Sequence, residues 1–426
     1  MLIGFVTGSL TSVGSGRAIV LPLASSAAEL GHQTFGLQLA RLRKGLAEID
    51  GLRVWQEPLW PQLLASPLDL VGIVRKRLTP GSQAITSQSR LTAYQRVAAK
   101  ALHRGCNRLA LDVVYAFHNT NVALLLAQKP IPSTILVINL IGFGIDPSRG
   151  GAVDTFPLQK YIFSRPHWDL HVAATHFEYE QYRQVYETLG LDPSRLLYLP
   201  HPYDENSFYP NNSQAATQGT GEDEKVLLYP VNVYRRKNIE LAIDVTALLS
   251  QQWAVRLVVT GRIWDQKYLR ALQEQVASRG IGDRVEFLRG VPYEQLVERY
   301  REASATIFTS HQETFGHGIV QSLGSGTPVV GPNWINPCRE ILEASYGGYC
   351  ADMDAESFAA AIDDLFRNPP EARRIAQGAR RRYGNKVIAA RFLRAVDKVL
   401  RQKHQYATDL YAIDWKKLYR DAGTLL

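Results

Sequence analysis

Residues 311–332 have the sequence HQETFGHGIVQSLGSGTPVVGP, which carries the strongest structural signal in the chain. They follow an apolar run at residues 305–308 and open with a polar turn. Ile319, Val320 and Leu323 then recur at the spacing of one helix face. We therefore predict a helix that begins near Phe315, followed by a turn and a buried strand. This order of elements is typical of an α/β fold.

The first turn of this predicted helix is rich in glycine. Because Gly316 and Gly318 lack a Cβ, the backbone there can approach a ligand closely. The free N–H groups and the positive dipole end of a helix start attract an anion. Glu313 comes just before them, and a carboxylate accepts hydrogen bonds from hydroxyl groups. Together these features indicate a phosphorylated sugar as the ligand. The alternative is a Rossmann-type turn with a surface glutamate.

This segment resembles the E-x7-E segment of the retaining glycosyltransferases of family four, which have the GT-B fold. The residues that match the family pattern are Glu313, Phe315, Gly316, Gly326, Pro328 and Val329. The chain departs from the pattern at Gln321, where the family has a second glutamate, and at Gly324, where alanine is usual. The resemblance implies an α/β chain of two Rossmann-like domains facing across a cleft, with a C-terminal helix that crosses back to the first domain.

The resemblance also implies that the segment binds a donor, a nucleotide diphosphate sugar. Glu313 would orient the hydroxyl groups of the transferred sugar. The rest of the donor would contact Thr314, Phe315, Gly316 and Gln321. A glutamine amide has one acceptor oxygen and two donor hydrogens, so Gln321 can replace the family's ribose contact only in part.

Residues 230–238, PVNVYRRKN, place three cations at a strand-to-helix turn, where they can neutralise a phosphate group. The resemblance assigns diphosphate binding to Lys237. Asn232 stands where the family has arginine, so either Arg235 or Arg236 would supply the second charge. The alternative is that these cations form surface salt bridges.

Two later segments also follow the family pattern. Gly261 comes after the predicted strand at residues 255–260. Gly290 and Val291 match the loop whose backbone contacts the nucleotide base in the family. We therefore expect all three residues to line the donor site.

The first half of the chain matches the pattern more loosely. Residues 112–119 resemble a segment whose last histidine faces the donor sugar, which assigns this contact to His118; the alternative is a hydrogen-bonded structural histidine. Gly14 and Gly16 resemble the glycine loop on the acceptor side of the cleft. This loop lacks the G-x-G-x-x-G spacing of dinucleotide-binding folds, which disfavours that class.

With 426 residues the chain exceeds the size of one ordinary hydrophobic core, so we expect two domains. Residues 1–208 would form the acceptor-binding domain and residues 225–400 the nucleotide-sugar domain. The polar stretch at 209–224 would be a linker. Residues 401–426 would form the helix that packs back on the first domain.

The positive charge lies at one end of the sequence. Residues 1–110 hold 13 Lys and Arg against 5 Asp and Glu, so they account for the whole net charge of +8. Two clusters, at residues 41–44 and 75–77, could bind anionic lipid headgroups or an anionic acceptor. The alternative is a solvated helix face.

Several classes are disfavoured by what the sequence lacks. It contains no apolar run long enough to span a membrane and no signal-peptide pattern at its start. Cys106, Cys338 and Cys350 form neither a metal-binding spacing nor a disulfide framework. No D-x-D metal motif is convincing. We therefore expect a cytoplasmic protein, peripheral on the inner face of the membrane, that needs no metal ion or other cofactor and binds no nucleic acid.

The function predicted on this basis is transfer of a hexose from a nucleotide diphosphate sugar to a saccharide or lipid-linked acceptor, with retention of anomeric configuration. The residues expected to act in catalysis are Glu313, Lys237, Arg236 and His118. Two alternatives remain open at this stage. One is a nucleotide-sugar epimerase or a phosphorylase on the same fold, and the other is a non-catalytic glycosyltransferase-like subunit.

Overall fold

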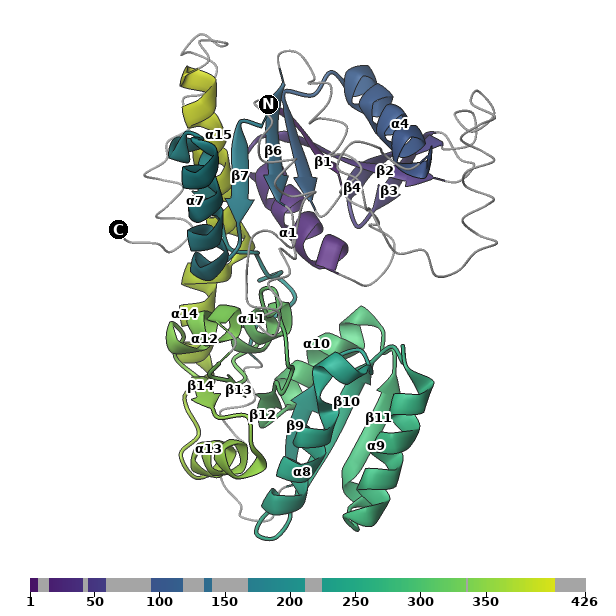
Figure 1. The fold of residues 1–426 in the computed structure, drawn as a ribbon, viewed down its shortest axis with the longest axis vertical. Coiled ribbons are helices and arrows are strands. Elements are labelled where there is room, and N and C mark those ends of the chain that lie inside the picture. The colour runs from purple at the N-terminus through teal and green to yellow at the C-terminus, as the bar shows by residue number, and fades with distance from the viewer. Residues whose placement is uncertain are drawn as a thin grey trace. The chain divides into compact units, whose positions relative to one another are not determined.

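The computed structural model describes residues 1–6, 15–40, 45–58, 93–117, 134–139, 168–210, 224–334 and 336–402. The chain divides into two compact units, which are described separately (Figure 1). The first unit comprises Met1–Pro200 together with the chain from Ile388 onward, and the second comprises His201–Val387.

The first unit is built on a sheet of eight described strands. They are β1 (Leu2–Val6), β2 (Gln33–Ala40), β3 (Gly45–Ile49), β4 (Leu52–Pro58), β5 (Val113–Phe117), β6 (Ile135–Asn139), β7 (Leu170–Ala173) and β8 (Leu196–Tyr198). Their order in the sheet is β3-β4-β2-β1-β5-β6-β7-β8. Only β3 and β4 pair antiparallel, whereas the other described neighbours pair parallel. The α/β class predicted from the sequence is confirmed.

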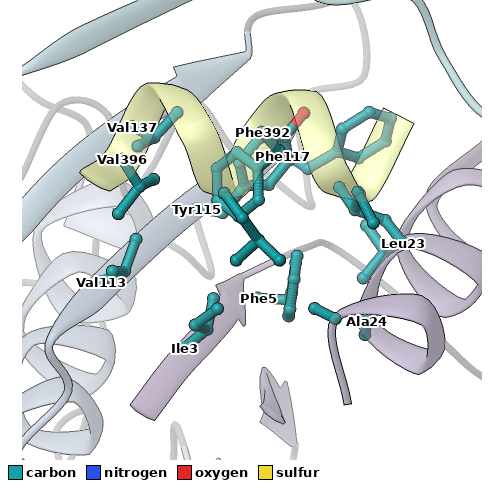
Figure 2. Close-up of a cluster of buried hydrophobic side chains, with 14 of the residues drawn as sticks. Ile3, Phe5, Leu23, Ala24, Val113, Tyr115, Phe117, Val137, Phe392 and Val396 are labelled. Atoms are coloured by element: carbon teal, nitrogen blue, oxygen red, sulfur yellow. The ribbon is translucent and has the colours of Figure 1, made fainter. Parts of the chain in front are cut away.

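Helices cover both faces of this sheet. The described ones are α1 (Ser15–Glu29), α4 (Ala93–Leu109), α7 (His176–Leu189) and α15 (Asn385–Gln402), with a short 3-10 turn at Pro193–Arg195. On one face Ile3 and Phe5 belong to a core shared with α1 and α15, which Figure 2 shows. On the other face Val6 packs in a cluster with Cys106 of α4. Because successive side chains of β1 point to opposite faces of the sheet, the strand contributes to a separate hydrophobic core on each face.

Residues 36–110, for which no strand or helix was predicted above, contain β3, β4, α4 and most of β2. β3 and β4 form a two-residue hairpin at Asp50-Gly51, and both turn residues have positive φ, 48° and 77°. Such a turn favours an Asp-Gly pair. This dipeptide is therefore a sequence signal for the hairpin, which was not among the predicted elements.

The second unit has a sheet of six described strands. They are β9 (Lys225–Tyr229), β10 (Val255–Gly261), β11 (Val285–Arg289), β12 (Ala305–Ile307), β13 (Val329–Pro332) and β14 (Gly348–Ala351). The order is β11-β10-β9-β12-β13-β14, and every neighbouring pair is parallel. Leu227, Leu228 and Tyr229 of the central strand β9 are all fully buried. Burial on both faces is typical of a parallel sheet covered by helices.

The second unit has seven described helices, and two of them begin at an aspartate that caps them. The seven are α8 (Ile239–Leu249), α9 (Gln266–Ser278), α10 (Tyr293–Glu302), α11 (His317–Gly324), α12 (Asn336–Glu343), α13 (Ala355–Arg367) and α14 (Ala372–Tyr383), with 3-10 turns η5 (Arg235–Lys237) and η6 (Gly282–Arg284). Asp265 accepts hydrogen bonds from the first N–H groups of α9, and Asp354 does so for α13. These caps satisfy N–H groups that the helix itself leaves free.

The boundaries between the units differ from the predicted ones. The chain enters the second unit at His201 rather than after residue 208. The reason is that the N–H of Tyr203 donates a hydrogen bond to the carbonyl of Tyr383. In addition, the ring of Phe208 packs against the rings of Tyr293 and Tyr300. Residues 211–223 of the predicted linker lie outside the described residues.

The return to the first unit also comes earlier than predicted. It begins at Ile388, within α15, instead of at residue 401. The reason is that Ile388, Phe392 and Val396 of α15 belong to the first core. Residues 403–426, where the crossing helix was expected, lie outside the described residues. Among the described helices, none has the length and apolar character needed to cross a bilayer.

Candidate functional site

Chemically active side chains gather at one edge of the second sheet. The turn η5, with its three cations, follows β9, and the segment Thr309–Glu313 follows β12. β9 and β12 are parallel neighbours, so their carboxyl ends lie side by side. In open α/β sheets ligands bind at this edge.

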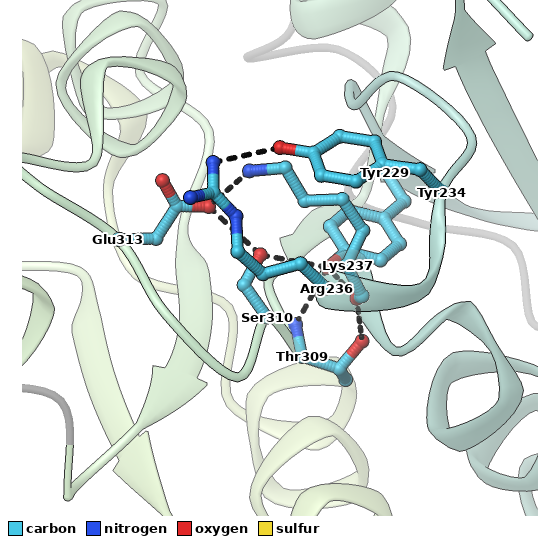
Figure 3. Close-up of polar contacts among 7 residues, drawn as sticks. All are labelled: Tyr229, Tyr234, Arg236, Lys237, Thr309, Ser310 and Glu313. Carbon is cyan, nitrogen blue, oxygen red and sulfur yellow. Dashed lines mark hydrogen bonds and ion pairs between the residues drawn. The ribbon is translucent and has the colours of Figure 1, made fainter. Parts of the chain in front are cut away.

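Lys237 and Glu313 meet at the centre of this site. The Lys237 ammonium group forms an ion pair and hydrogen bond with Glu313 Oε1, which also accepts a hydrogen bond from Ser310 Oγ at 2.8 Å (Figure 3). Only 12% of the lysine and 15% of the glutamate side chain is exposed. The two charges are therefore largely shielded from solvent. In such a partly buried site electrostatic interactions are stronger than at the protein surface.

Tyr229 holds the two loops together. Its hydroxyl donates to the carbonyl of Lys237 at 2.5 Å and accepts from the backbone N–H of Thr309 at 3.1 Å. Thr309 Oγ1 in turn donates to the carbonyl of Asn238 at 2.7 Å. Burial raises the pKa of Tyr229 well above its usual value, so the hydroxyl keeps its proton. These bonds fix the backbone that carries Lys237 and Glu313.

The structure separates the roles of the two arginines that the sequence left open. Arg236 Nη2 donates to the hydroxyl of Tyr234 at 2.8 Å, and Figure 3 shows Arg236 beside the pair of Lys237 and Glu313. The guanidinium of Arg235 lies 5.5 Å from the ring centroid of Tyr268, in α9. Of the two, Arg236 is therefore the one that could supply the second charge to a phosphate beside Lys237.

Asn232 and Gly261 connect the loops after β9 and β10. Asn232 Oδ1 accepts a hydrogen bond from the backbone N–H of Arg262 at 2.9 Å. A Cβ on Gly261 would lie 2.2 Å from the carbonyl oxygen of Val231, so only glycine allows this approach. Both residues thus have a structural task here, and their predicted contact with the donor stays a prediction.

The helix start that suggested an anion site is present. α11 begins at His317, after Gly316, which has φ of 90° and provides no side-chain cap. Thr314 is exposed, whereas Phe315 is buried, with its ring 4.7 Å from that of His201 and 6.2 Å from that of Tyr383. The phenylalanine ring therefore anchors the loop, and any contact of Phe315 with a ligand would come from its backbone.

Gln321 has a protein partner. Its side chain is buried within α11, with a residue exposure of 8%, and its Oε1 accepts a hydrogen bond from the hydroxyl of Tyr300 at 3.3 Å. Burial raises the pKa of Tyr300 far above its usual value, so that hydroxyl remains a donor. Because an amide oxygen can accept two hydrogen bonds, one acceptor position and the two amide N–H groups remain for a ribose contact.

His317 was not among the predicted site residues. It is the first residue of α11, and both of its ring nitrogens are buried without a hydrogen-bond partner in the described parts of the chain. Burial lowers the pKa of its imidazole to about 4, so the ring is neutral at physiological pH. A buried polar group without a partner is uncommon and calls for an explanation. The sequence signal was a polar ring directly after Gly316.

The remaining predicted residues are spread over the chain. Gly290, with Val291 after it, follows β11, and its N–H donates to the carbonyl of Gly261 at 3.2 Å, so both lie at the same sheet edge. Gly16 lies at the start of α1, in the first unit. Gly14 and His118 lie outside the described residues. Within the described ranges, no three His, Cys, Asp or Glu side chains are arranged to hold a metal ion.

Chemically, the site combines cations, a carboxylate and the N-terminus of a helix. Lys237, Arg236 and the start of α11 can bind an anion such as a diphosphate. Lys237 and Ser310 both bind Oε1 of Glu313, so the carboxylate has further acceptor positions for hydroxyl groups. This is the combination that the sequence indicated for a phosphorylated sugar.

Comparison with known proteins identifies relatives of the chain. The family described as Glycosyl transferases group 1 matches residues 211–382, which is most of the second unit. The D-inositol 3-phosphate glycosyltransferase of Geodermatophilus obscurus is 29% identical over 259 residues, 58% of this chain and 55% of the relative. The mannosylfructose-phosphate synthase of Agrobacterium fabrum is 31% identical over 153 residues, 34% of each chain. The chain therefore spans about half the length of these curated relatives, or less.

Solved structures match over nearly the whole chain. Sucrose-phosphate synthase from Thermosynechococcus elongatus gives a TM-score of 0.69 at 16% identity, covering 94% of this chain and 99% of that one. The Anabaena protein HepE, solved with UDP and glucose, gives 0.67 at 16% identity and covers 93% and 100%. At such low identity the likeness shows the fold, and it confirms the GT-B fold predicted from the sequence.

Proposed function

Because the chain has the GT-B fold and its second unit belongs to the group 1 glycosyl transferases, we propose that it transfers a sugar from a nucleotide diphosphate sugar to a saccharide or lipid-linked acceptor. The observation that carries the proposal is the ion pair of Lys237 and Glu313 at the carboxyl edge of the second sheet. One partner suits a phosphate and the other suits sugar hydroxyls.

The proposed chemistry follows from how charge develops. As the glycosidic bond breaks, the leaving diphosphate gains negative charge. Lys237, Arg236 and the N–H groups at the start of α11 would stabilise this charge, since fixed donors and cations aimed at developing charge lower a barrier. Glu313 would orient the donor sugar through its hydroxyl groups. We propose retention of anomeric configuration, with the leaving phosphate taking the proton of the acceptor.

The names of the relatives suggest what the acceptor could be. They include an inositol 3-phosphate glycosyltransferase and a mannosyltransferase of Xenopus laevis whose name carries a dolichol-linked saccharide. A polyol, a saccharide and a lipid-linked saccharide are therefore all acceptors to test. We further propose a cytoplasmic protein that meets an anionic membrane through the basic clusters at residues 41–44 and 75–77, which lie outside the described residues.

The first experiment is a screen of nucleotide sugars by melting temperature, since a ligand that binds only the folded state raises it. The stabilising donor is then incubated with candidate acceptors in the presence of a chelator. We expect a glycoside whose anomeric configuration, read by NMR, equals that of the donor. A protein that is stabilised by no nucleotide sugar and no nucleoside diphosphate would refute the proposal. Release of nucleotide without a glycoside would point to a different reaction.

A further inference from the structure

An exposed tryptophan and a half-buried tyrosine lie beside the candidate donor site. Trp264, in the loop after β10, is 64% exposed, and its ring stacks on that of Tyr234 with centroids 5.1 Å apart and planes at 25°. We call these two residues the aromatic platform. Tyr234 covers one face of the indole, and most of the tryptophan surface remains open to solvent. A large apolar side chain left open in this way is often a binding feature.

The backbone under the platform is held by hydrogen bonds. The N–H of Val233 donates to the carbonyl of Arg262 at 2.9 Å, and the N–H of Trp264 donates to the carbonyl of Val233 at 3.1 Å. Asp265, directly after the tryptophan, caps α9 through its side chain. The two rings are thus carried by a fixed pair of loops. A preorganised surface loses little conformational entropy when a ligand binds.

The platform adjoins the residues proposed to bind the donor. The hydroxyl of Tyr234 accepts from Arg236 Nη2 at 2.8 Å, and Lys237 Nζ lies 5.9 Å from the centroid of the Tyr234 ring. Figure 3 shows Tyr234 on the same side of the site as these two cations. A ligand on the platform would therefore lie next to a donor bound at Lys237 and Glu313.

The chemistry of the platform fits a sugar ring with an acidic group. The negative face of an aromatic ring attracts the polarised C–H bonds on the apolar face of a pyranose. Arg236 and Arg262 are both exposed near the platform, in addition to Lys237. The nucleotide base has its own expected position after β11, at Gly290, and a neutral base needs no further cation. A carboxylate or phosphate group on the acceptor saccharide, by contrast, does need a cation nearby.

We propose that Tyr234 and Trp264 form a subsite for the acceptor, where a sugar ring stacks on the indole and its carboxylate or phosphate group meets Arg236 and Arg262. This inference rests on the proposed glycosyl transfer. It gives the acceptor a contact in the second unit in addition to residues 1–208, which are expected to bind it, and it narrows the acceptor to saccharides that carry an acidic group.

The test uses the full chain labelled with 5-fluorotryptophan. The chain has seven tryptophans, and the Trp264→Phe variant assigns the resonance of Trp264. Two probes are titrated over about 10–100 mM, the range of weak single-ring binding: methyl α-D-glucopyranosiduronate and the neutral methyl α-D-glucopyranoside. We expect the Trp264 resonance to shift with both. The acidic sugar should reach half-saturation at a concentration about threefold lower, as an exposed ion pair would give.

A matched control is Tyr346→Ala. Tyr346 is also an exposed aromatic residue, but it precedes β14 and so lies at the opposite edge of the sheet. In Tyr346→Ala the sugar titrations should be unchanged. In Trp264→Ala binding is followed on the resonances of the sugar, and their saturable shift on addition of protein should be lost.

Three outcomes would overturn the inference. In the first, neither sugar shifts the Trp264 resonance. In the second, both sugars shift it with the same half-saturation. In the third, uridine or guanosine diphosphate shifts it but neither sugar does. Nucleoside diphosphate binding by calorimetry in the same samples tests the proposed function separately. A protein that binds nucleotide but no sugar at Trp264 refutes only the subsite.

Discussion

At the scale of single residues, Lys237 and Glu313 define the site although 76 positions separate them in the sequence. Their opposite charges neutralise each other. An ammonium group has three N–H donors, and a carboxylate has two acceptor oxygens, so the lysine can bind a diphosphate and the glutamate can bind sugar hydroxyls while the ion pair stays formed.

The first prediction concerns Lys237. Replacement by alanine should weaken the binding of nucleoside diphosphates by about 1.5–3 kcal/mol, the contribution of a hydrogen bond to a charged group. Isothermal titration calorimetry measures this change. Lys225→Ala is the matched control, because Lys225 begins the same strand, β9, at its other end. Equal nucleotide affinity in the two variants would argue against a diphosphate at Lys237.

The second prediction concerns Gln321. In Gln321→Glu a carboxylate would take the place of the amide next to the buried hydroxyl of Tyr300. Because the group is buried, its charge should lower the melting temperature. Its second acceptor oxygen should nevertheless keep or strengthen nucleotide binding, if ribose lies there. A folded variant that no longer binds nucleotide in calorimetry would show that Gln321 serves another partner.

At the scale of elements, the start of α11 depends on glycine. Gly316 has φ of 90°, which strains any residue with a Cβ, and a Cβ there would also lie 2.9 Å from Ile319 Cδ1, so that side chain would have to move. The positive φ turns the chain directly from the loop of Glu313 into the helix. The unpaired N–H groups of α11 and the carboxylate are thereby held on one short segment.

The third prediction tests this turn. Gly316→Ala should reduce stability by about 1–3 kcal/mol, the cost of a strained backbone position, and should weaken nucleoside diphosphate binding as the helix start shifts. Gly378→Ala is the control, because Gly378 lies inside α14 with open space around its Cα. That change should stabilise the protein by roughly 0.5–1 kcal/mol. Denaturant unfolding and calorimetry compare the two, and a loss of equal size in both would contradict the argument.

At the scale of the whole molecule, burial keeps three histidines neutral among those in the described parts of the chain. Burial lowers the pKa of His317 and of His32 to about 4 and that of His171 to about 3, and the N-terminal ammonium group adds to the effect at His32. The unfolded chain has an ordinary histidine pKa near 6.5. Between these values the unfolded state binds more protons than the folded state, so stability rises with pH in this window.

The fourth prediction follows from this increase of stability with pH. As pH falls from 6.5 towards 4, the free energy of unfolding should decrease, by up to about 1.4 kcal/mol per pH unit for each of these histidines. Guanidinium unfolding at several pH values measures the slope. In His317→Leu the slope should be smaller for the transition of the second unit. A variant with an unchanged slope would show that His317 does not contribute.

Much of this organisation follows from local sequence pattern. The apolar run before Gly261 located β10 to within one residue, because strand and turn preferences act over a few neighbouring positions. The GT-B fold and the choice of Lys237 and Glu313 came from two separate motifs, each of which is continuous in sequence. The hairpin of β3 and β4 was the exception, since its Asp-Gly turn lay in a segment with little apolar alternation.

Other features depend on which strands become neighbours, and no local pattern states that. β9 lies next to β12 in the sheet, and this order brings Lys237 to Glu313 and Tyr229 to Thr309. The loop after β10 adjoins the loop after β9 for the same reason, which stacks Trp264 on Tyr234. α15 looked like an ordinary last helix of the second unit, yet its apolar face belongs to the first core. Each of these contacts joins segments that are distant in the sequence. They form only when the tertiary structure packs those segments together.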